Sequence, residues 1–177
     1  DVLSLERWSA LQGGETAVVW HGRLDGYAVT VIGVENQPVQ RVGVVNEGPK
    51  QWAGGTLYPQ ASRKVARAIR ASQSRTPVIV LANLSGFDGS PESLRQWQLE
   101  YGSEIAQAVE NFDAPIYFIV LSRYHGGAYV VFSKSLNPKL EALALHGSFA
   151  SVIGGAPAAA VIFGVAEQKE GEDKSGK

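Results

Sequence analysis

Two short apolar segments constrain the fold of this chain most strongly. Residues 77–82 (PVIVLA) and 116–121 (IYFIVL) are continuous hydrophobic runs of strand length, a pattern typical of strands buried on both faces of a sheet. Each run leads into a loop that contains glycine, and each loop leads into a predicted helix. Strands that alternate with helices in this way predict an α/β domain with crossover connections.

The N-terminal part of the chain has the pattern of a β-hairpin. Residues 16–20 (TAVVW) and 28–34 (AVTVIGV) are rich in β-branched side chains, and Asp25-Gly26 lies between them. An Asp-Gly pair tolerates the positive φ of a tight turn, so we expect these two strands to be antiparallel neighbours. A third short strand is expected within residues 39–45.

Two helices are predicted from their start signals. A helix of about four turns begins near Pro59, because proline suits the first helical position. A second and longer helix begins at Ser90, Pro91 and Glu92, which read as the N-cap, the first helical residue and an acidic first turn. We expect this second helix to end near Asn111.

The C-terminal part is less regular. Residues 140–145 fit a helix and a strand equally well, and residues 151–163 suggest a strand, a turn and a final helix. Residues 167–177 hold seven charged side chains and no apolar one, which predicts a charged disordered tail. We therefore expect one domain over residues 1–166, which matches the size of an ordinary single domain.

Composition removes several classes of function. Sixteen basic and 17 acidic side chains give a formal charge of −1, without the positive charge that phosphate neutralisation requires, so no nucleic-acid partner is expected. No segment approaches the ~20 apolar residues of a membrane span, and the first residues do not resemble a signal peptide. The chain has no cysteine, which excludes disulfides and thiolate catalysis and fits a cytoplasmic location. The three histidines lie at positions 21, 125 and 146, too far apart along the chain for the usual zinc motif, so no metal is expected.

Helix starts at the carboxyl ends of strands offer amide N–H groups to a ligand, and three kinds of chemistry use them. A phosphate cradle is disfavoured because the sequence has neither G-x-G-x-x-G nor G-x-x-x-x-G-K-[ST]. A nucleophile elbow is disfavoured because Ala128 enters the helix at the turn after residues 116–121, and alanine has no nucleophilic atom. A backbone oxyanion hole, in which the Gly127 and Ala128 amides face a developing anion, stays open.

Each of these features also has an ordinary structural interpretation. Taken alone, a glycine pair in such a turn more often serves tight packing or positive φ, and His125 more often forms a hydrogen bond in a loop. Four basic side chains of the first helix are interpreted as a solvated face, and two tryptophans as packing residues. These side chains are Arg63, Lys64, Arg67, Arg70, Trp52 and Trp97.

Four ordered motifs resemble those of biotin-dependent acyl-CoA carboxyltransferases. The motifs are residues 54–69 (GGTLYPQASRKVARAI), 81–93 (LANLSGFDGSPES), 122–134 (SRYHGGAYVVFSK) and 147–160 (GSFASVIGGAPAAA). The similarity extends from about Gly22 to Phe163 and is greatest to the C-terminal half of the carboxyltransferase in bacterial single-chain acyl-CoA carboxylases, with propionyl-CoA carboxylase β subunits as relatives. The resemblance implies a crotonase-like fold, the ββα superhelix also called the ClpP/crotonase fold.

The resemblance also implies a site and a set of partners. In this family the amides of Gly127 and Ala128 would hold the biotin ureido oxygen within the turn Gly126–Tyr129, and the Gly86–Phe87 loop would form the adjoining wall. The second half of the site would come from an N-terminal carboxyltransferase half-domain. A biotin carboxyl carrier domain, a biotin carboxylase and assembly into a homo-oligomer are implied as well.

The implied reaction transfers a carboxyl group from carboxybiotin to the α-carbon of an acyl-CoA. Carboxybiotin would release CO₂, the Gly127 and Ala128 amides would stabilise the charge left on the ureido oxygen, and biotin would remove the α-proton of the thioester. Val130 stands where relatives tune acyl-chain preference. His125 stands where the eukaryotic enzymes have an arginine that binds a carboxylate, so recognition of a malonyl group does not carry over.

Two other functions remain open. The chain could be a catalytically silent fragment or an assembly domain of such a complex. It could also be a stand-alone crotonase-type hydratase or isomerase, which is disfavoured because no glutamate lies in the glycine-rich turns to act as a general base. Glu92 is the nearest candidate, and it fits a helix first turn better.

Overall fold

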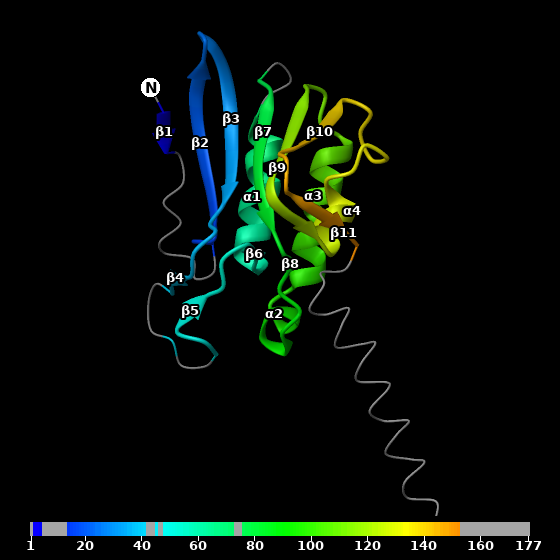
Figure 1. Cartoon of the computed structure of the whole chain (residues 1–177). Helices are drawn as coiled ribbons and strands as arrows, with labels where there is room; N and C mark the ends of the chain where they lie inside the picture. Colours follow the sequence, from blue (N-terminus) through cyan, green and yellow to red (C-terminus); the bar gives the residue numbers. More distant parts are fainter. Residues whose placement is uncertain (1, 5–13, 42–44, 46–47, 73–75, 153–177) are drawn as a thin grey trace, which may run out of the picture.

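The computed structural model describes residues 2–4, 14–41, 45, 48–72 and 76–152. Within them, the main sheet has the strand order β1-β2-β3-β7-β9-β10, and β11 pairs with β9 beyond β10. Its strands are β1 (Val2–Ser4), β2 (Ala17–Leu24), β3 (Tyr27–Val34), β7 (Val78–Leu84), β9 (Ile116–His125), β10 (Leu140–Ala144) and β11 (Phe149–Ser151). Strands β1 to β3 are antiparallel, while β3, β7, β9, β10 and β11 pair in parallel (Figure 1).

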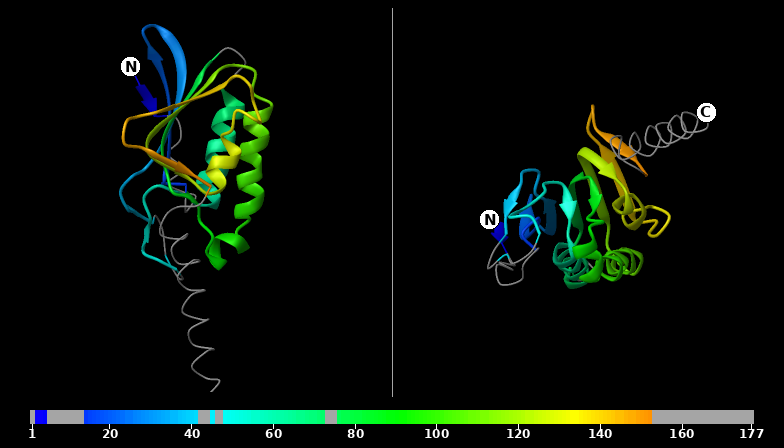
Figure 2. Two further views of the ribbon diagram at one scale, coloured as in Figure 1. Left: turned by 45° about the vertical axis from the view of Figure 1, so that its right-hand side comes forward. Right: turned by 90° about the horizontal axis from the view of Figure 1, so that it is seen from below.

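Two helices cover one face of this sheet. Helix α1 (Pro59–Ala71) lies on the connection from β3 to β7, and α3 (Gln98–Glu110) on the connection from β7 to β9. They pack side by side against the same face (Figure 2). This arrangement confirms the predicted α/β domain with crossover connections, and the helix predicted from Pro59.

The expectation that the two apolar strands are buried on both faces is wrong. Along β7, residues 78, 80, 82 and 84 are buried, while the residues between them are only partly buried. In β9 the outward-facing Tyr117 and Leu121 are exposed. The reason is that the helices cover one face, and no described helix covers the other, so the strands alternate as a one-sided sheet does.

The N-terminal hairpin is confirmed. Strands β2 and β3 pair over their full length, and both Asp25 and Gly26 have positive φ, at 48° and 82°. Two positive φ values are what a right-twisted two-residue turn requires. The third strand, β4, is limited to Val39–Gln40 and pairs with β5 (Gln51–Trp52); residues 42–44 of the expected strand lie outside the described part.

The single long helix predicted from Ser90 to Asn111 is wrong in its middle. The structure has α2 (Pro91–Arg95) and then α3, separated by Trp97 in the left-handed conformation with φ 68° and ψ 37°. The predicted start and end are confirmed, since the Ser90 side chain caps α2 and Asn111 caps α3. Helix α3 packs against α1, and the buried Gln98 side chain at its start donates a hydrogen bond to Ser62 Oγ of α1 at 2.9 Å.

The remaining boundaries refine the sequence predictions. Strand β9 continues to His125, four residues past the apolar run, because both its edges find partners. Residues 140–145, which fitted both patterns, form the strand β10. Strand β11 begins before residue 151, and the predicted turn, final helix, domain end at 166 and charged tail all lie outside the described residues. No helix in the described part is long and apolar enough to cross a membrane.

Candidate active site

Three glycine-containing turns meet beyond the carboxyl ends of β7 and β9. The Ser85 N–H donates to the Gly55 carbonyl at 2.6 Å, which joins the turn before α1 to the turn after β7. Strand β6 (Thr56–Leu57) then pairs in parallel with β8 (Gly86–Phe87). The third turn lies against the second, since a Cβ added to Gly126 would lie 3.5 Å from Gly86 Cα. The first three motifs quoted from the sequence therefore converge at one edge of the fold.

The first glycine pair is explained by packing. A Cβ on Gly54 would collide with the backbone carbonyl of Asn36. Gly55 has a φ of 73°, and its N–H donates to the Glu35 carbonyl at 2.6 Å. The ordinary structural interpretation holds here, because both positions need glycine to let neighbouring backbone approach.

The second glycine pair has two different causes. Gly126 has a φ of 64°, and its N–H donates to the Val152 carbonyl at 3.0 Å. Gly127 begins helix α4 (Gly127–Val131), where no unusual φ is needed, but a Cβ there would lie 2.5 Å from Cδ2 of Phe87. The space beside Gly127 is thus occupied by this chain's own Phe87 ring. What Gly127 can offer to a ligand is its amide.

The amides of Gly127 and Ala128 are the first two of helix α4. The first amides of a helix have no acceptor within that helix. Neither of these two amides donates to a carbonyl of the described residues, whereas the next amide, of Tyr129, donates to the Gly126 carbonyl at 3.0 Å. The buried Ala128 methyl fixes the turn in the core. Two adjacent amides of this kind suit an oxygen atom that carries negative charge.

Phe87 lies between two helices. Its ring contacts Gly127 on α4, and a Cβ on Gly102 of α3 would lie 3.3 Å from its Cε2 atom. The Phe87 backbone is held by the pairing of β8 with Leu57, whose carbonyl also accepts from the Asp88 N–H at 3.0 Å. The structure thus places the Gly86–Phe87 segment directly beside the Gly126–Gly127 turn, where the sequence predicted a wall of the site.

His125, the predicted specificity residue before the glycines, forms the kind of hydrogen bond expected of a loop residue. Its Nδ1 atom lies 3.0 Å from Ser151 Oγ on β11. Tyr129 and Val130 point outward from α4, with 41% and 59% of their surface exposed. Their roles toward biotin and the acyl chain stay predictions.

Tyr124 supports the same turn from β9. Its hydroxyl donates to the carbonyl of Phe132, and its ring lies 5.0 Å from the ring of Tyr129. Burial raises the pKa of the Tyr124 hydroxyl well above its ordinary value of 10, and Tyr129 adds to the shift. The hydroxyl is therefore a neutral donor that holds the end of α4.

Sequence reasoning missed Arg123 and Asn83 as supports of the site. The Arg123 Nε atom donates to Asn83 Oδ1 at 3.1 Å, and its Nη2 atom would lie 3.1 Å from a Cβ on Gly55. This side chain thus crosses from β9 to the end of β7 and to the turn that precedes β6. Arg123 stands inside one of the quoted motifs, but nothing in its spacing signals a partner 40 residues away.

Two structural interpretations of the α1 and α3 regions are wrong. Lys64 does not belong to the solvated face, since only 5% of it is exposed and its Nζ atom donates to the Ala17 carbonyl at 2.6 Å. Trp97 is not a packing residue, because 61% of it is exposed. The solvated face is confirmed for Arg63, Arg67 and Arg70, and the packing role for the buried Trp52.

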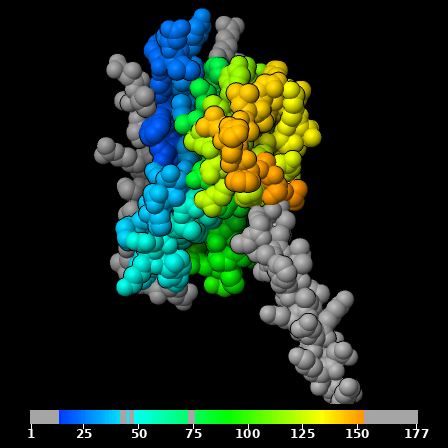
Figure 3. Space-filling view, in the orientation of Figure 1, coloured from blue at the N-terminus to red at the C-terminus, as the bar shows by residue number. Residues whose placement is uncertain are grey.

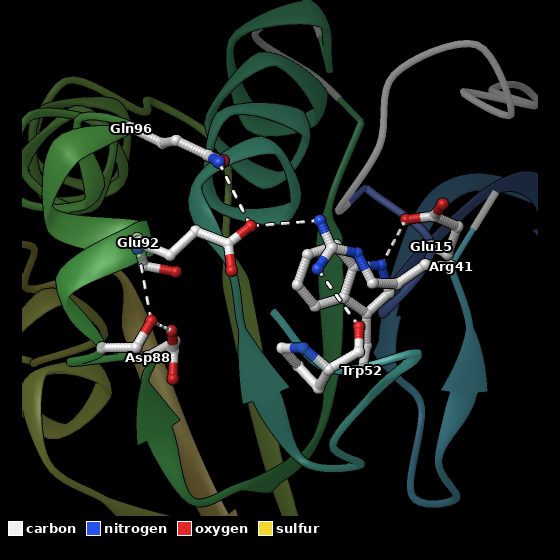
Figure 4. Close-up of polar contacts among 9 residues, drawn as sticks. Glu15, Arg41, Trp52, Asp88, Glu92 and Gln96 are labelled. Atoms are coloured by element: carbon white, nitrogen blue, oxygen red, sulfur yellow. Dashed lines mark hydrogen bonds and ion pairs between the residues drawn. The ribbon is translucent and has the colours of Figure 1, made fainter. Parts of the chain in front are cut away.

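A partly buried charge cluster links α2, which follows the Phe87 segment in the chain, to Arg41 (Figure 4). Arg41 donates to Glu92 Oε1 at 3.1 Å, and its guanidinium lies 4.1 Å from the centre of the Trp52 ring. The Trp52 indole N–H donates to Glu15 at 3.0 Å. Glu92 is thus a first-turn residue engaged in an ion pair, which leaves it poorly suited to act as a general base. Among the described residues no three acidic or histidine side chains are grouped to hold a metal ion.

Comparisons with known proteins agree with this picture. A family model described as a carboxyl transferase domain matches residues 11–176. The chain is 31% identical over 147 residues to acetyl-CoA carboxylase dmxL1 of Cryptosporiopsis sp. (strain 8999), and 29% identical over 148 residues to acetyl-CoA carboxylase 1 of Oryza sativa subsp. japonica. These matches cover 77% and 78% of this chain but 6% of each relative.

A solved structure gives the same answer in three dimensions. The β subunit of geranyl-CoA carboxylase from P. aeruginosa superposes with a TM-score of 0.75 at 28% identity. The superposition covers 96% of this chain and 29% of that subunit. The chain therefore corresponds to a small part of each longer protein that it resembles.

Proposed function

Since the chain belongs to the carboxyl transferase domain family and has its crotonase-like fold, we propose that it supplies one half of the carboxyl-transfer site of a biotin-dependent acyl-CoA carboxylase. The observation that carries this proposal is the pair of adjacent amides of Gly127 and Ala128, held at the first turn of α4 next to Phe87. Neither amide has a recorded acceptor within the described residues.

The donor set fits the proposed cofactor. A ureido oxygen is a strong acceptor that gains negative charge when the carboxyl group leaves, and two preorganised amides stabilise such charge without reorganising. Carboxybiotin, when bound, would supply the carboxyl group. The chain's own contribution is to hold that oxygen at the Gly127 and Ala128 amides, while Gly86 and Phe87 keep the turn in place and exclude water on one side.

The rest of the site lies outside this chain in our proposal. As the resemblance implies, an N-terminal carboxyltransferase half-domain would bind most of the acyl-CoA and stabilise its enolate. Carboxybiotin would arrive on a biotin carboxyl carrier domain that a biotin carboxylase has loaded. Exposed apolar residues on β9, β10 and β11 favour assembly into an oligomer. The yellow-to-orange part of Figure 3 shows that the C-terminal part of the described chain lies at the surface.

The proposal predicts that the isolated chain does not carboxylate acyl-CoA and that an N-terminal half-domain restores the reaction. The assay supplies free carboxybiotin and acetyl-CoA, or a longer acyl-CoA, and measures the carboxylated thioester with each half alone and with both together. Because each half would hold one oxyanion, product is expected only from the mixture. Turnover by this chain alone would contradict the half-site assignment.

Two substitutions at one position then test the amide itself. Gly127→Pro removes the N–H and adds a Cβ, whereas Gly127→Ala adds the Cβ alone, so Ala is the matched control for the collision with Phe87. Loss of one oxyanion donor typically lowers the rate by ~10²–10³-fold. The Pro variant should therefore be slower than the Ala variant by about that factor. Equal rates of the two variants, with the Ala variant still active, would remove the amide from the mechanism.

A catalytically silent assembly domain is the second candidate. Exposed apolar side chains on the outer sheet face and on β11 favour it, because an interaction surface needs no catalytic group. Wild-type activity of the mixture that survives Gly127→Pro would support it. A hydratase or isomerase is not supported, since Glu92 is paired with Arg41.

A further inference from the structure

The Phe87 ring is enclosed by two positions that have no side chain. It lies next to Gly127, where the proposed amides begin, and next to Gly102 in the second turn of α3, and both glycines face its Cδ2 and Cε2 atoms. Cβ atoms built at these positions would lie 2.5 Å and 3.3 Å from ring carbons. Carbon atoms normally pack 3.5–4.0 Å apart. The ring therefore occupies space that a side chain at either position would need.

Gly102 has no backbone reason to be glycine. It lies within a helix, its φ is not in the left-handed region, and it is buried. Glycine inside a helix is less favourable than alanine. The backbone conformation would accept alanine, and the neighbour that its methyl group would meet is the Phe87 ring.

The backbone that carries the ring is held in place by its neighbours. Phe87 pairs with Leu57 in the β6–β8 ladder, and Asp88 donates to Leu57 as well. A methyl group on Gly102 would therefore displace the ring itself, and the same ring atoms lie next to Gly127.

We propose that Gly102 is a positioning residue of the carboxyl-transfer site: the absence of a side chain there lets Phe87 set the position of the Gly127 and Ala128 amides. This inference rests on the proposed function of those amides. Gly102 acts through Phe87 and touches no ligand itself, so its effect is expected in the rate of transfer and not in the folding of the domain.

The test is Gly102→Ala in the two-half transfer assay together with thermal unfolding of the chain. A shift of the amides should lower kcat by roughly tenfold or more, because misplacement by a fraction of an ångström to 1 Å weakens a preorganised site strongly. The melting temperature should stay the same or rise, since alanine favours the helix. Unchanged kcat, or a fall in kcat only in proportion to a fall in melting temperature, would overturn the proposal.

Ser103→Ala is the matched control. Ser103 is the next residue of α3 and is exposed, so this change improves the helix without entering the space of the ring. Its kcat should equal that of the wild type. Phe87→Leu provides the rescue test: in that background, Gly102→Ala should cause little further loss, because the ring through which it acts is gone. Equal losses in both backgrounds would show that Gly102 acts by another route.

An NMR measurement on the chain separates failure of this inference from failure of the proposed function. The ring current of Phe87 shifts nearby amide protons, so Gly102→Ala should move the Gly127 and Ala128 amide signals while Ser103→Ala leaves them in place. If the wild-type halves show no transfer, the proposed function fails, and the amide signals still decide whether Gly102 controls the turn. Unmoved amide signals would overturn the inference whatever the assay shows.

Discussion

At the scale of single residues, Lys64 shows how a charged side chain of an amphipathic helix can be buried and form a hydrogen bond inside the fold. It follows Arg63 in α1, and its Nζ atom crosses to the Ala17 carbonyl at the start of β2. Its helical neighbours three before and four after, Ala61 and Ala68, are both buried. A strict count of the helical period therefore places Lys64 on the inner face, although its charge suggests the outer one.

Lys64→Met is expected to destabilise the fold. Methionine keeps most of the apolar stem but removes the donor, and a hydrogen bond from a charged group is worth about 1.5–3 kcal/mol. The free energy of unfolding, measured with urea, should fall by about that amount, whereas Lys134→Met on the surface should change it little. A variant as stable as the wild type would mean that burying the ammonium costs as much as its bonds contribute.

At the scale of elements, the connection from β9 to α4 determines the site, and Tyr124 joins the two. Its ring packs 4.5 Å from the Phe118 ring on β9, and its hydroxyl donates to the end of α4 at Phe132. The raised pKa of Tyr124 adds a pH dependence with a definite sign. The unfolded hydroxyl ionises first, so this part of the stability is complete below pH ~10 and is lost as the pH rises through the pKa of the folded state.

Tyr124→Phe should therefore have two effects. Near neutral pH the unfolding free energy should fall by about 1 kcal/mol, because the hydrogen bond to the Phe132 carbonyl is lost. Above pH ~10 the variant should lose stability less steeply than the wild type. Burial also raises the pKa of Tyr58, so part of the loss of stability at alkaline pH persists in both the wild type and the variant. Urea titrations at several pH values measure both effects, and parallel pH curves would rule out the assigned role.

At the scale of the whole molecule, the Arg41–Glu92 pair connects segments 51 residues apart. Arg41 follows β4 in the N-terminal half of the described chain, and Glu92 lies in α2, next to the segment that carries Phe87. The Arg41 side chain is 4% exposed, so water screens this pair weakly. The pair therefore links α2, next to the Phe87 segment, to a part of the chain that lies outside the turns of the site.

Glu92→Gln tests this long-range link. The exchange keeps the shape of the side chain but removes its charge, and the free energy of unfolding should fall by about 1.5–3 kcal/mol. The matched control is Glu141→Gln, whose pair with Lys134 is exposed on both sides and should be worth less than ~1 kcal/mol. An equal fall in the free energy of unfolding for the two substitutions would show that the Arg41–Glu92 pair stabilises the fold no more than an exposed pair does.

Features encoded by neighbouring residues were predictable from the sequence. The Asp25-Gly26 hairpin, the helix start at Pro59 and the cap at Ser90 each follow from residues a few positions apart, and the α/β class follows from their order. The four motifs identified the family and brought attention to the turns that the fold then places together. Local sequence determines backbone preference, turn type and caps because these depend on φ, ψ and hydrogen bonds over a few residues.

Only the tertiary structure decided the rest. It separated the glycines that need a positive φ from those that need space for a neighbouring group, and it placed the Lys64 ammonium inside the fold. It also divided the predicted long helix at Trp97 and made residues 140–144 a strand. It also brought Gly102 to the Phe87 ring. Each of these outcomes depends on a contact between elements distant in sequence, and the free energy of such contacts overrides weak local preferences.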